Sequence, residues 1–68
     1  MTIKGKIISR PYHTHRHTAF LIDYKGMILP CIYTGYADVE AGDVVVLSGE
    51  ARERGTWQEF AVQKLTLF

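Results

Sequence analysis

The sequence has a single cysteine, no long apolar run and almost no net charge. Cys31 has no second cysteine in the chain to pair with, which excludes an intrachain disulfide framework. The longest uncharged run, residues 26–37, contains Pro30 and two glycines and falls well short of the roughly 20 residues that a membrane span needs. Residues 1–6 carry charge where a signal peptide needs its apolar stretch. These absences predict a protein without a membrane partner, in a reducing, cytoplasmic setting.

The length of 68 residues is enough for one domain with one small core. Hydrophobic residues make up 47% of the chain, charged residues 22%, and the net charge is +1. This composition is too apolar and too weakly charged for intrinsic disorder. A core of this size is marginal, so good packing, a metal or a partner must add stability. We expect a single folded domain over residues 1–68.

Turn residues divide the chain into five apolar stretches of strand length, and none shows sustained helical periodicity. The expected strands are residues 2–9, 18–24, 27–33, 44–51 and 57–68. Lys25-Gly26 predicts a tight hairpin turn, and Gly55 marks a second turn. Pro30 cannot donate a ladder hydrogen bond, which predicts a sheet edge or a bulge at that point. The connection after residue 33 has room for one helical turn at most, so the fold class is all-β.

Alternation along the strands assigns side chains to an inner and an outer face. The inner face is expected to hold Ile3, Ile7, Ala19, Leu21, Ile28, Ile32, Val45, Leu47, Phe60 and Val62. The outer face is expected to hold Phe20, Ile22, Tyr24, Leu29, Cys31, Tyr33, Val44, Val46 and Trp57. The opposite register of the second strand is also possible, because Phe20 and Ile22 would fill a core equally well. Because this outer face is so apolar, we expect a partner to cover it, either a second copy of the chain or another protein.

Four segments resemble a known fold family, and together they cover nearly the whole chain. They are IKGKIIS, FLIDYKGMI, GDVVVLSGEARERG and WQEFAVQKL. Their order is similar to that in the OB-fold domains of aminoacyl-tRNA synthetases, replication protein A and exodeoxyribonuclease large subunits. The resemblance implies a five-stranded Greek-key barrel in which Gly5 and Gly49 let their strands coil sharply. The family often places a helix between the third and fourth strands, but this chain has little or no room for one. Tyr36 and Val39, or a partner, would then close that end of the barrel.

OB-folds of this kind bind single-stranded nucleic acid or oligosaccharide across the second and third strands, between two loops. The resemblance therefore implies a nucleic-acid-binding site. Its candidate residues in the first loop are Arg10, Tyr12, His13, His15, Arg16 and His17. Those of the strands and their turn are Phe20, Tyr24, Lys25 and Tyr33, and those of the second loop are Arg52, Arg54 and Trp57. Aromatic side chains beside cations suit base stacking and phosphate contact.

Charge is divided unevenly along the chain. Residues 1–27 hold five cations and one acid, a net charge of +4, and residues 28–68 hold three cations and six acids, a net charge of −3. The positive charge therefore lies on the expected binding side. A strongly basic stripe is missing, so binding to nucleic acid should be modest and strongly salt-dependent.

The remaining polar residues argue for binding and against catalysis. His13, His15 and His17 alternate as metal ligands can, but no acid or cysteine lies nearby in sequence to complete a zinc site. We therefore expect ligand contact or a solvated loop there, and no metal or other cofactor. Asp23 and Asp43 are expected to hold turns, and the chain has no phosphate loop and no Ser-His-Asp set.

The sequence thus predicts a non-catalytic module that binds single-stranded DNA or RNA. The alternative is a protein-interaction module that forms a homodimer, or a subunit of a larger complex, through its apolar outer face. The loop cations with Tyr12 and Trp57 favour the first hypothesis, and Val44 and Val46 favour the second.

Overall fold

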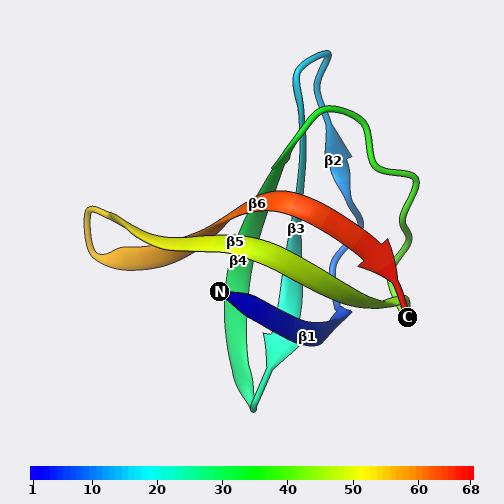
Figure 1. The fold of residues 1–68 in the computed structure, drawn as a ribbon. Coiled ribbons are helices and arrows are strands. Elements are labelled where there is room, and N and C mark those ends of the chain that lie inside the picture. Colours follow the sequence, from blue (N-terminus) through cyan, green and yellow to red (C-terminus); the bar gives the residue numbers. More distant parts are fainter.

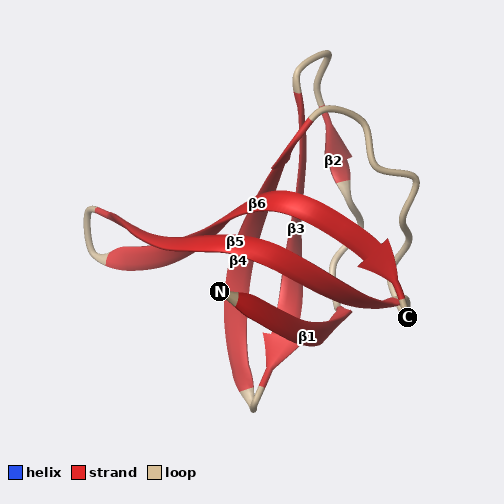
Figure 2. Ribbon diagram, in the orientation of Figure 1, coloured by secondary structure: helices blue, strands red, loops and turns tan.

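In a computed structural model that describes all 68 residues, the chain forms a closed five-stranded β-barrel without a helix (Figures 1 and 2). The strands are β1 (Thr2–Ile7), β2 (Tyr12–His13), β3 (His17–Tyr24), β4 (Met27–Thr34), β5 (Val44–Arg54) and β6 (Trp57–Leu67). The barrel follows the order β1-β5-β6-β4-β3, and β3 pairs back with β1. Only β4 and β6 run parallel. The all-β prediction is confirmed, and the connectivity is compatible with an OB-fold barrel.

Two details extend the predicted strand pattern. The short strand β2 forms inside the expected first loop and pairs with the outer edge of β3. The β5–β6 hairpin is longer than expected and projects beyond the barrel, to the left in Figure 1. The chain has no helix long and apolar enough to cross a membrane.

The two predicted turn aspartates act as expected. At the β3–β4 hairpin, Lys25 and Gly26 have φ values of 52° and 80°, and the Gly26 N–H donates to Asp23 Oδ1 at 3.1 Å. Before β5, the Glu40 N–H donates to Asp43 Oδ2 at 2.9 Å. Each carboxylate thus satisfies a backbone donor that the turn leaves free.

Pro30 lies where β4 has a partner on only one side. It is opposite Leu21 in β3, and pairing of β4 with β6 begins one residue later. The Leu21 N–H donates to Ser9 Oγ at 2.9 Å and its carbonyl accepts from the Ile8 N–H at 2.9 Å, so both groups point away from β4. No ladder donor is needed from residue 30, and the predicted edge position is confirmed.

The predicted faces are correct on three strands and wrong on β3 and β4. The buried residues that were expected in the core are Ile3, Ile7, Val45, Leu47, Phe60 and Val62. On β3 and β4 the core instead receives Phe20, Ile22 and Cys31. The outer face of these two strands carries Ala19, Leu21, Ile28 and Ile32, which were expected inside. The predicted apolar outer patch therefore loses Phe20, Ile22 and Cys31 to the core.

A buried hydroxyl group fixes this register. Thr18 Oγ1 donates to the Gly35 carbonyl at 2.9 Å and accepts from the Ala37 N–H at 3.0 Å, and Thr18 is fully buried. Even-numbered residues of β3 therefore point inward. Odd-numbered residues point outward, where Asp23 reaches the turn amide.

The connection between β4 and β5 closes one end of the barrel without a helix. Ala37 and Val39 are buried in the core, whereas Tyr36 is 70% exposed. The prediction for Val39 is confirmed and that for Tyr36 is wrong.

Gly49 allows β5 to bend over β6. The register shifts between Ser48 and Gly49, so that Ser48 pairs with Lys64 and Gly49 with Val62. Gln63 is thus left out of the ladder as a β-bulge. A Cβ atom on Gly49 would overlap the Ala61 carbonyl oxygen, which is a backbone atom and cannot move aside freely. The predicted coiling role of Gly49 follows from this contact.

We predict that Gly49→Ala strongly destabilises the protein, by about 2–4 kcal/mol, because the β5 and β6 backbones must separate. Gly26→Ala is the control, since a Cβ there meets no atom within 4 Å and only the positive φ of 80° opposes it. That control should lose about 1–2 kcal/mol. Urea unfolding measures both, and equal losses would contradict the proposed contact.

Cys31 is a core residue and not a reactive thiol. It is 1% exposed, and burial raises the pKa of its thiol from 9.0 to about 12. The folded state therefore favours the neutral thiol over the thiolate. The free energy of unfolding is therefore unaffected by ionisation of Cys31 below about pH 9. It declines as the pH rises from about 9 toward 12, because the Cys31 thiol then loses its proton in the unfolded chain but keeps it in the folded protein.

We predict that Cys31 reacts with a thiol reagent at pH 8 only through unfolded molecules. Modification should be at least about a hundredfold slower in buffer than in guanidinium, since reaction requires a neutral, buried thiol to open. Absorbance with Ellman's reagent measures both rates. Fast modification of the folded protein would show that Cys31 is accessible from the surface.

Candidate binding groove

The outer face of β3 and β4 carries a shallow groove of about 370 Å³. Its floor is made mainly of small and aliphatic side chains, namely Ala19, Leu21, Pro30 and Ile32. The strand order places β2 on one side of this floor and β6 on the other. This is the face on which the sequence predicted ligand binding, although the side chains that form the floor differ from those expected.

Two exposed aromatic rings line opposite sides of the groove. Tyr12 on β2 is 69% exposed and is held opposite Ala19 by the β2–β3 pairing. Trp57 at the start of β6 is 60% exposed and pairs with Arg54 across the hairpin. Both rings therefore offer apolar area to a ligand that lies across the floor. The predictions that place these two residues on one face are consistent with this arrangement.

A buried carboxylate joins the groove to the two arginines of the β5–β6 hairpin. The Glu59 side chain is 6% exposed and lines the groove, and its Oε2 atom accepts from Arg52 Nη2 at 2.9 Å and from Arg54 Nε at 3.0 Å. The arginine side chains themselves are 50% and 59% exposed. With Arg10 also lining the groove, three of the predicted cations lie on or beside it.

The histidines of the first loop lie outside the groove. The His13 ring stacks on Tyr36 with a centroid distance of 4.8 Å, and its Nδ1 lies 3.2 Å from Thr18 Oγ1. The Thr18 hydroxyl already donates to Gly35, so it accepts from His13, whose Nδ1 carries the proton. His13 thus links the first loop to the β4–β5 connection.

The tip of the same loop is an exposed turn. Thr14 Oγ1 accepts from the N–H groups of Arg16 and His17 at 3.2 and 2.9 Å, and the Gly35 N–H donates to the Arg16 carbonyl at 2.7 Å. His15, Arg16 and His17 are exposed and do not line the groove. No group of three histidine, cysteine, aspartate or glutamate side chains is placed to hold a metal ion.

Four other predicted site residues are not presented to a ligand in the groove. Phe20 is among the residues that line the groove, but it is 3% exposed and forms part of the core, which corrects its outward assignment. Tyr24 on β3 and Tyr33 on β4 are partly buried and pack against that core. Lys25 lies at the β3–β4 turn, with its Nζ 5.4 Å from the centre of the Tyr24 ring.

Sequence reasoning missed Glu59 and the aliphatic floor. The pattern that identifies Glu59 is the hairpin register around Gly55, which sets Arg52 opposite Glu59 and Arg54 opposite Trp57 on the same face. The floor residues were missed because β3 and β4 were assigned the opposite register.

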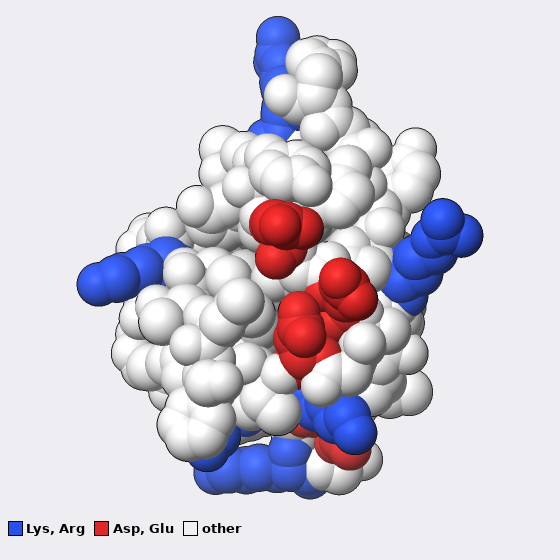
Figure 3. Space-filling view, turned by 90° about the vertical axis from the view of Figure 1, so that its right-hand side faces the viewer, with Lys and Arg blue, Asp and Glu red and all other residues white.

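Acidic side chains gather on a different side of the molecule. Figure 3 shows Asp and Glu in the middle of the face beside the C-terminus, with Lys and Arg mostly at its margins. The β4–β5 connection contains three acidic residues, Asp38, Glu40 and Asp43. A polyanionic ligand would be repelled from such a surface.

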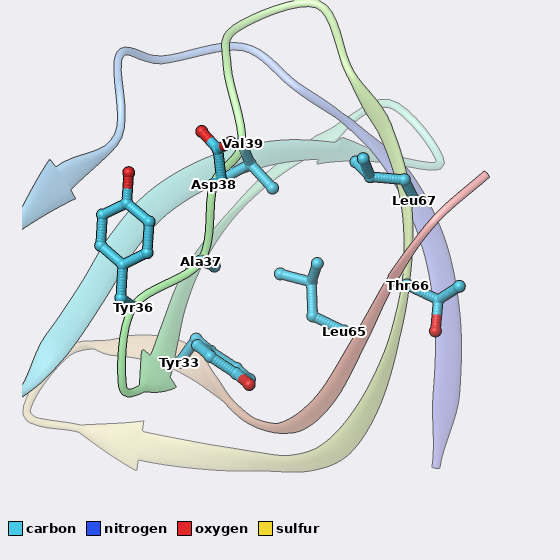
Figure 4. A pocket seen from close by; sticks show the side chains of 8 residues that line it. All are labelled: Tyr33, Tyr36, Ala37, Asp38, Val39, Leu65, Thr66 and Leu67. Atoms are coloured by element: carbon cyan, nitrogen blue, oxygen red, sulfur yellow. The ribbon is translucent and has the colours of Figure 1, made fainter.

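A larger cavity, of about 510 Å³, lies between the β4–β5 connection and the end of β6. Figure 4 shows Leu65 pointing into this cavity, with Tyr33 and Ala37 around it. Its only charged lining side chain is Asp38. It has an exposed tyrosine, Tyr36, and a partly buried one, Tyr33, but it lacks the cations that the smaller groove has.

The comparisons with known proteins add no relatives to this description. The chain matches no protein-family model, and searches of curated proteins and of solved structures find no match. The barrel topology itself is compatible with the OB-fold resemblance.

Proposed function

We propose that the protein is a non-catalytic module that binds single-stranded nucleic acid in the groove over β3 and β4. The observation that carries this proposal is the pair of exposed rings, Tyr12 and Trp57, on opposite sides of a flat apolar floor with arginines beside them. Bases stack on such rings and on small aliphatic surfaces, whichever base is present. Single strands expose these base faces, whereas a duplex hides them.

Phosphate contact would come from Arg10 and from the exposed parts of Arg52 and Arg54. Arg52 and Arg54 share the carboxylate of Glu59, so these two arginines and the glutamate together have a net charge of +1. Few phosphates are therefore neutralised, so we expect weak binding whose dependence on salt is shallower than that of a strongly basic protein.

We predict that Trp57→Ala weakens binding of a short single-stranded oligonucleotide by about 1–3 kcal/mol, the loss expected for one stacked base. Phe68→Ala is the matched control, because Phe68 is also exposed, at 79%, but lies outside the groove with Lys4 Nζ 3.4 Å from its ring centre. Fluorescence anisotropy of a labelled oligonucleotide measures both affinities. Equal effects of the two changes would contradict stacking in the groove.

We predict that Arg10→Gln lowers affinity and reduces the slope of log K against log salt by about 1, the change expected for one lost phosphate contact. Lys25→Gln serves as the control, because it removes an equal charge at the β3–β4 turn, outside the groove. Its slope should equal that of the wild type. If no oligonucleotide binds at low salt and high protein concentration, the proposed function is wrong.

A second candidate function is protein interaction, which the exposed aliphatic side chains of the β3–β4 hairpin favour. Met27 and Ile28 are 59% and 66% exposed, and Leu21 is 36% exposed. Such neighbouring apolar groups are typical of interaction surfaces. Sedimentation that shows a dimer abolished by Ile28→Lys, without loss of oligonucleotide binding, would support this function in addition to the first.

A further inference from the structure

Glu59 lines the groove and has one carboxylate oxygen that no group of the protein uses. Both arginines donate to Oε2, and no group of the protein donates to Oε1. No buried side-chain oxygen or nitrogen in the structure lacks a hydrogen-bond partner, so Oε1 must remain open to solvent. The Glu59 side chain is 6% exposed and is one of the residues that line the groove.

An ionised carboxylate can only accept hydrogen bonds. A ligand group placed against Oε1 must therefore be a donor, because a carbonyl oxygen there would face a negative charge across an apolar floor. Among pyrimidines, cytosine carries an amino donor at position 4, whereas uracil and thymine carry a carbonyl acceptor there. An oxygen that lies against position 4 thus distinguishes two bases of nearly identical shape.

We propose that Glu59 is the specificity-determining residue of the groove and that it selects a base with an exocyclic amino group, cytosine over uracil or thymine. This inference rests on the proposed function. Stacking on Tyr12 and Trp57 binds every base, and Glu59 Oε1 then accepts from the amino group of the base that lies over the floor. The guanidinium groups of Arg52 and Arg54 hold the carboxylate in place from the opposite side.

A lysine or arginine side chain from a protein partner would also donate to Oε1. The local charge favours the nucleobase, because Arg52 and Arg54 already place two cations within 3.0 Å of Glu59 Oε2. A third cation would be repelled by both, whereas an amino group on a base is neutral.

The test compares oligodeoxycytidine with oligodeoxyuridine of equal length at neutral pH and low salt. The wild-type protein should bind the cytidine strand about tenfold more tightly, as expected for one well-placed contact to a base edge. An oligonucleotide of N4,N4-dimethylcytidine, which has no N–H at that position, should lose this advantage. These measurements need no variant protein.

Glu59→Gln sharpens the test. Arginines are donors only, so they keep the amide oxygen of the glutamine on their side and turn its NH₂ group toward the groove. The variant should therefore prefer the uridine strand, whose position-4 carbonyl accepts from that NH₂ group. A purely structural role of Glu59 would weaken both strands alike, and thermal unfolding of the variant checks that it is folded.

The possible outcomes separate the two proposals. Equal affinity of the wild type for both strands overturns the role of Glu59 and leaves nucleic-acid binding intact. Failure to bind either strand overturns both proposals. In that case, binding of oligolysine that Glu59→Gln abolishes would identify a basic protein segment as the ligand.

Discussion

The barrel and the groove both depend on the close backbone contact between Gly49 and Ala61. On one side of this contact, β5 pairs with β1 from Val44 to Ser48 and helps to close the barrel. On the other side, β5 leaves the barrel wall and continues with β6 alone as a projecting hairpin. The residue without a side chain therefore separates the part of β5 that makes the core from the part that carries the arginines.

The hairpin brings charge to a surface that is otherwise apolar. Glu59 would be unfavourable in its buried position without donors, and Arg52 and Arg54 supply two charge-assisted hydrogen bonds to it. These bonds also restrain the arginines, which are then less free to follow a phosphate backbone. In the proposed site, recognition consequently depends more on base faces and base edges than on backbone charge.

Much of the fold could be predicted from the sequence because the turns are chemically explicit. Asp23, Lys25-Gly26 and Gly55 fix the two hairpins, and alternation then gives the correct inner face on β1, β5 and β6. The inner face of β3 and β4 could not be decided by alternation alone, since both faces are apolar. The structure decides it through the buried hydroxyl of Thr18, whose partners Gly35 and Ala37 lie in a distant part of the chain.

The groove lies on the face that the sequence indicated, but only some of the predicted residues line it. Arg10, Tyr12, Arg52, Arg54 and Trp57 lie on or beside the groove because they belong to the loops that flank it. Glu59 was missed because an acid in a strand looks like an ordinary solvated charge until its cross-strand partners are known. Long-range placement, and not residue type, determines which polar groups meet.

The position of β6 between β5 and β4 has a consequence for how the chain folds. The hairpins β3–β4 and β5–β6 join neighbouring segments, but the pairs that close the barrel join distant ones, such as Cys31 with Phe60 and Thr2 with Ser48. Bringing such distant segments together loses chain entropy before any contact repays it, and small barrels of this kind fold on the order of milliseconds to seconds. Docking of the two hairpins, with β1 completing the ring, therefore limits the folding rate more than formation of either hairpin.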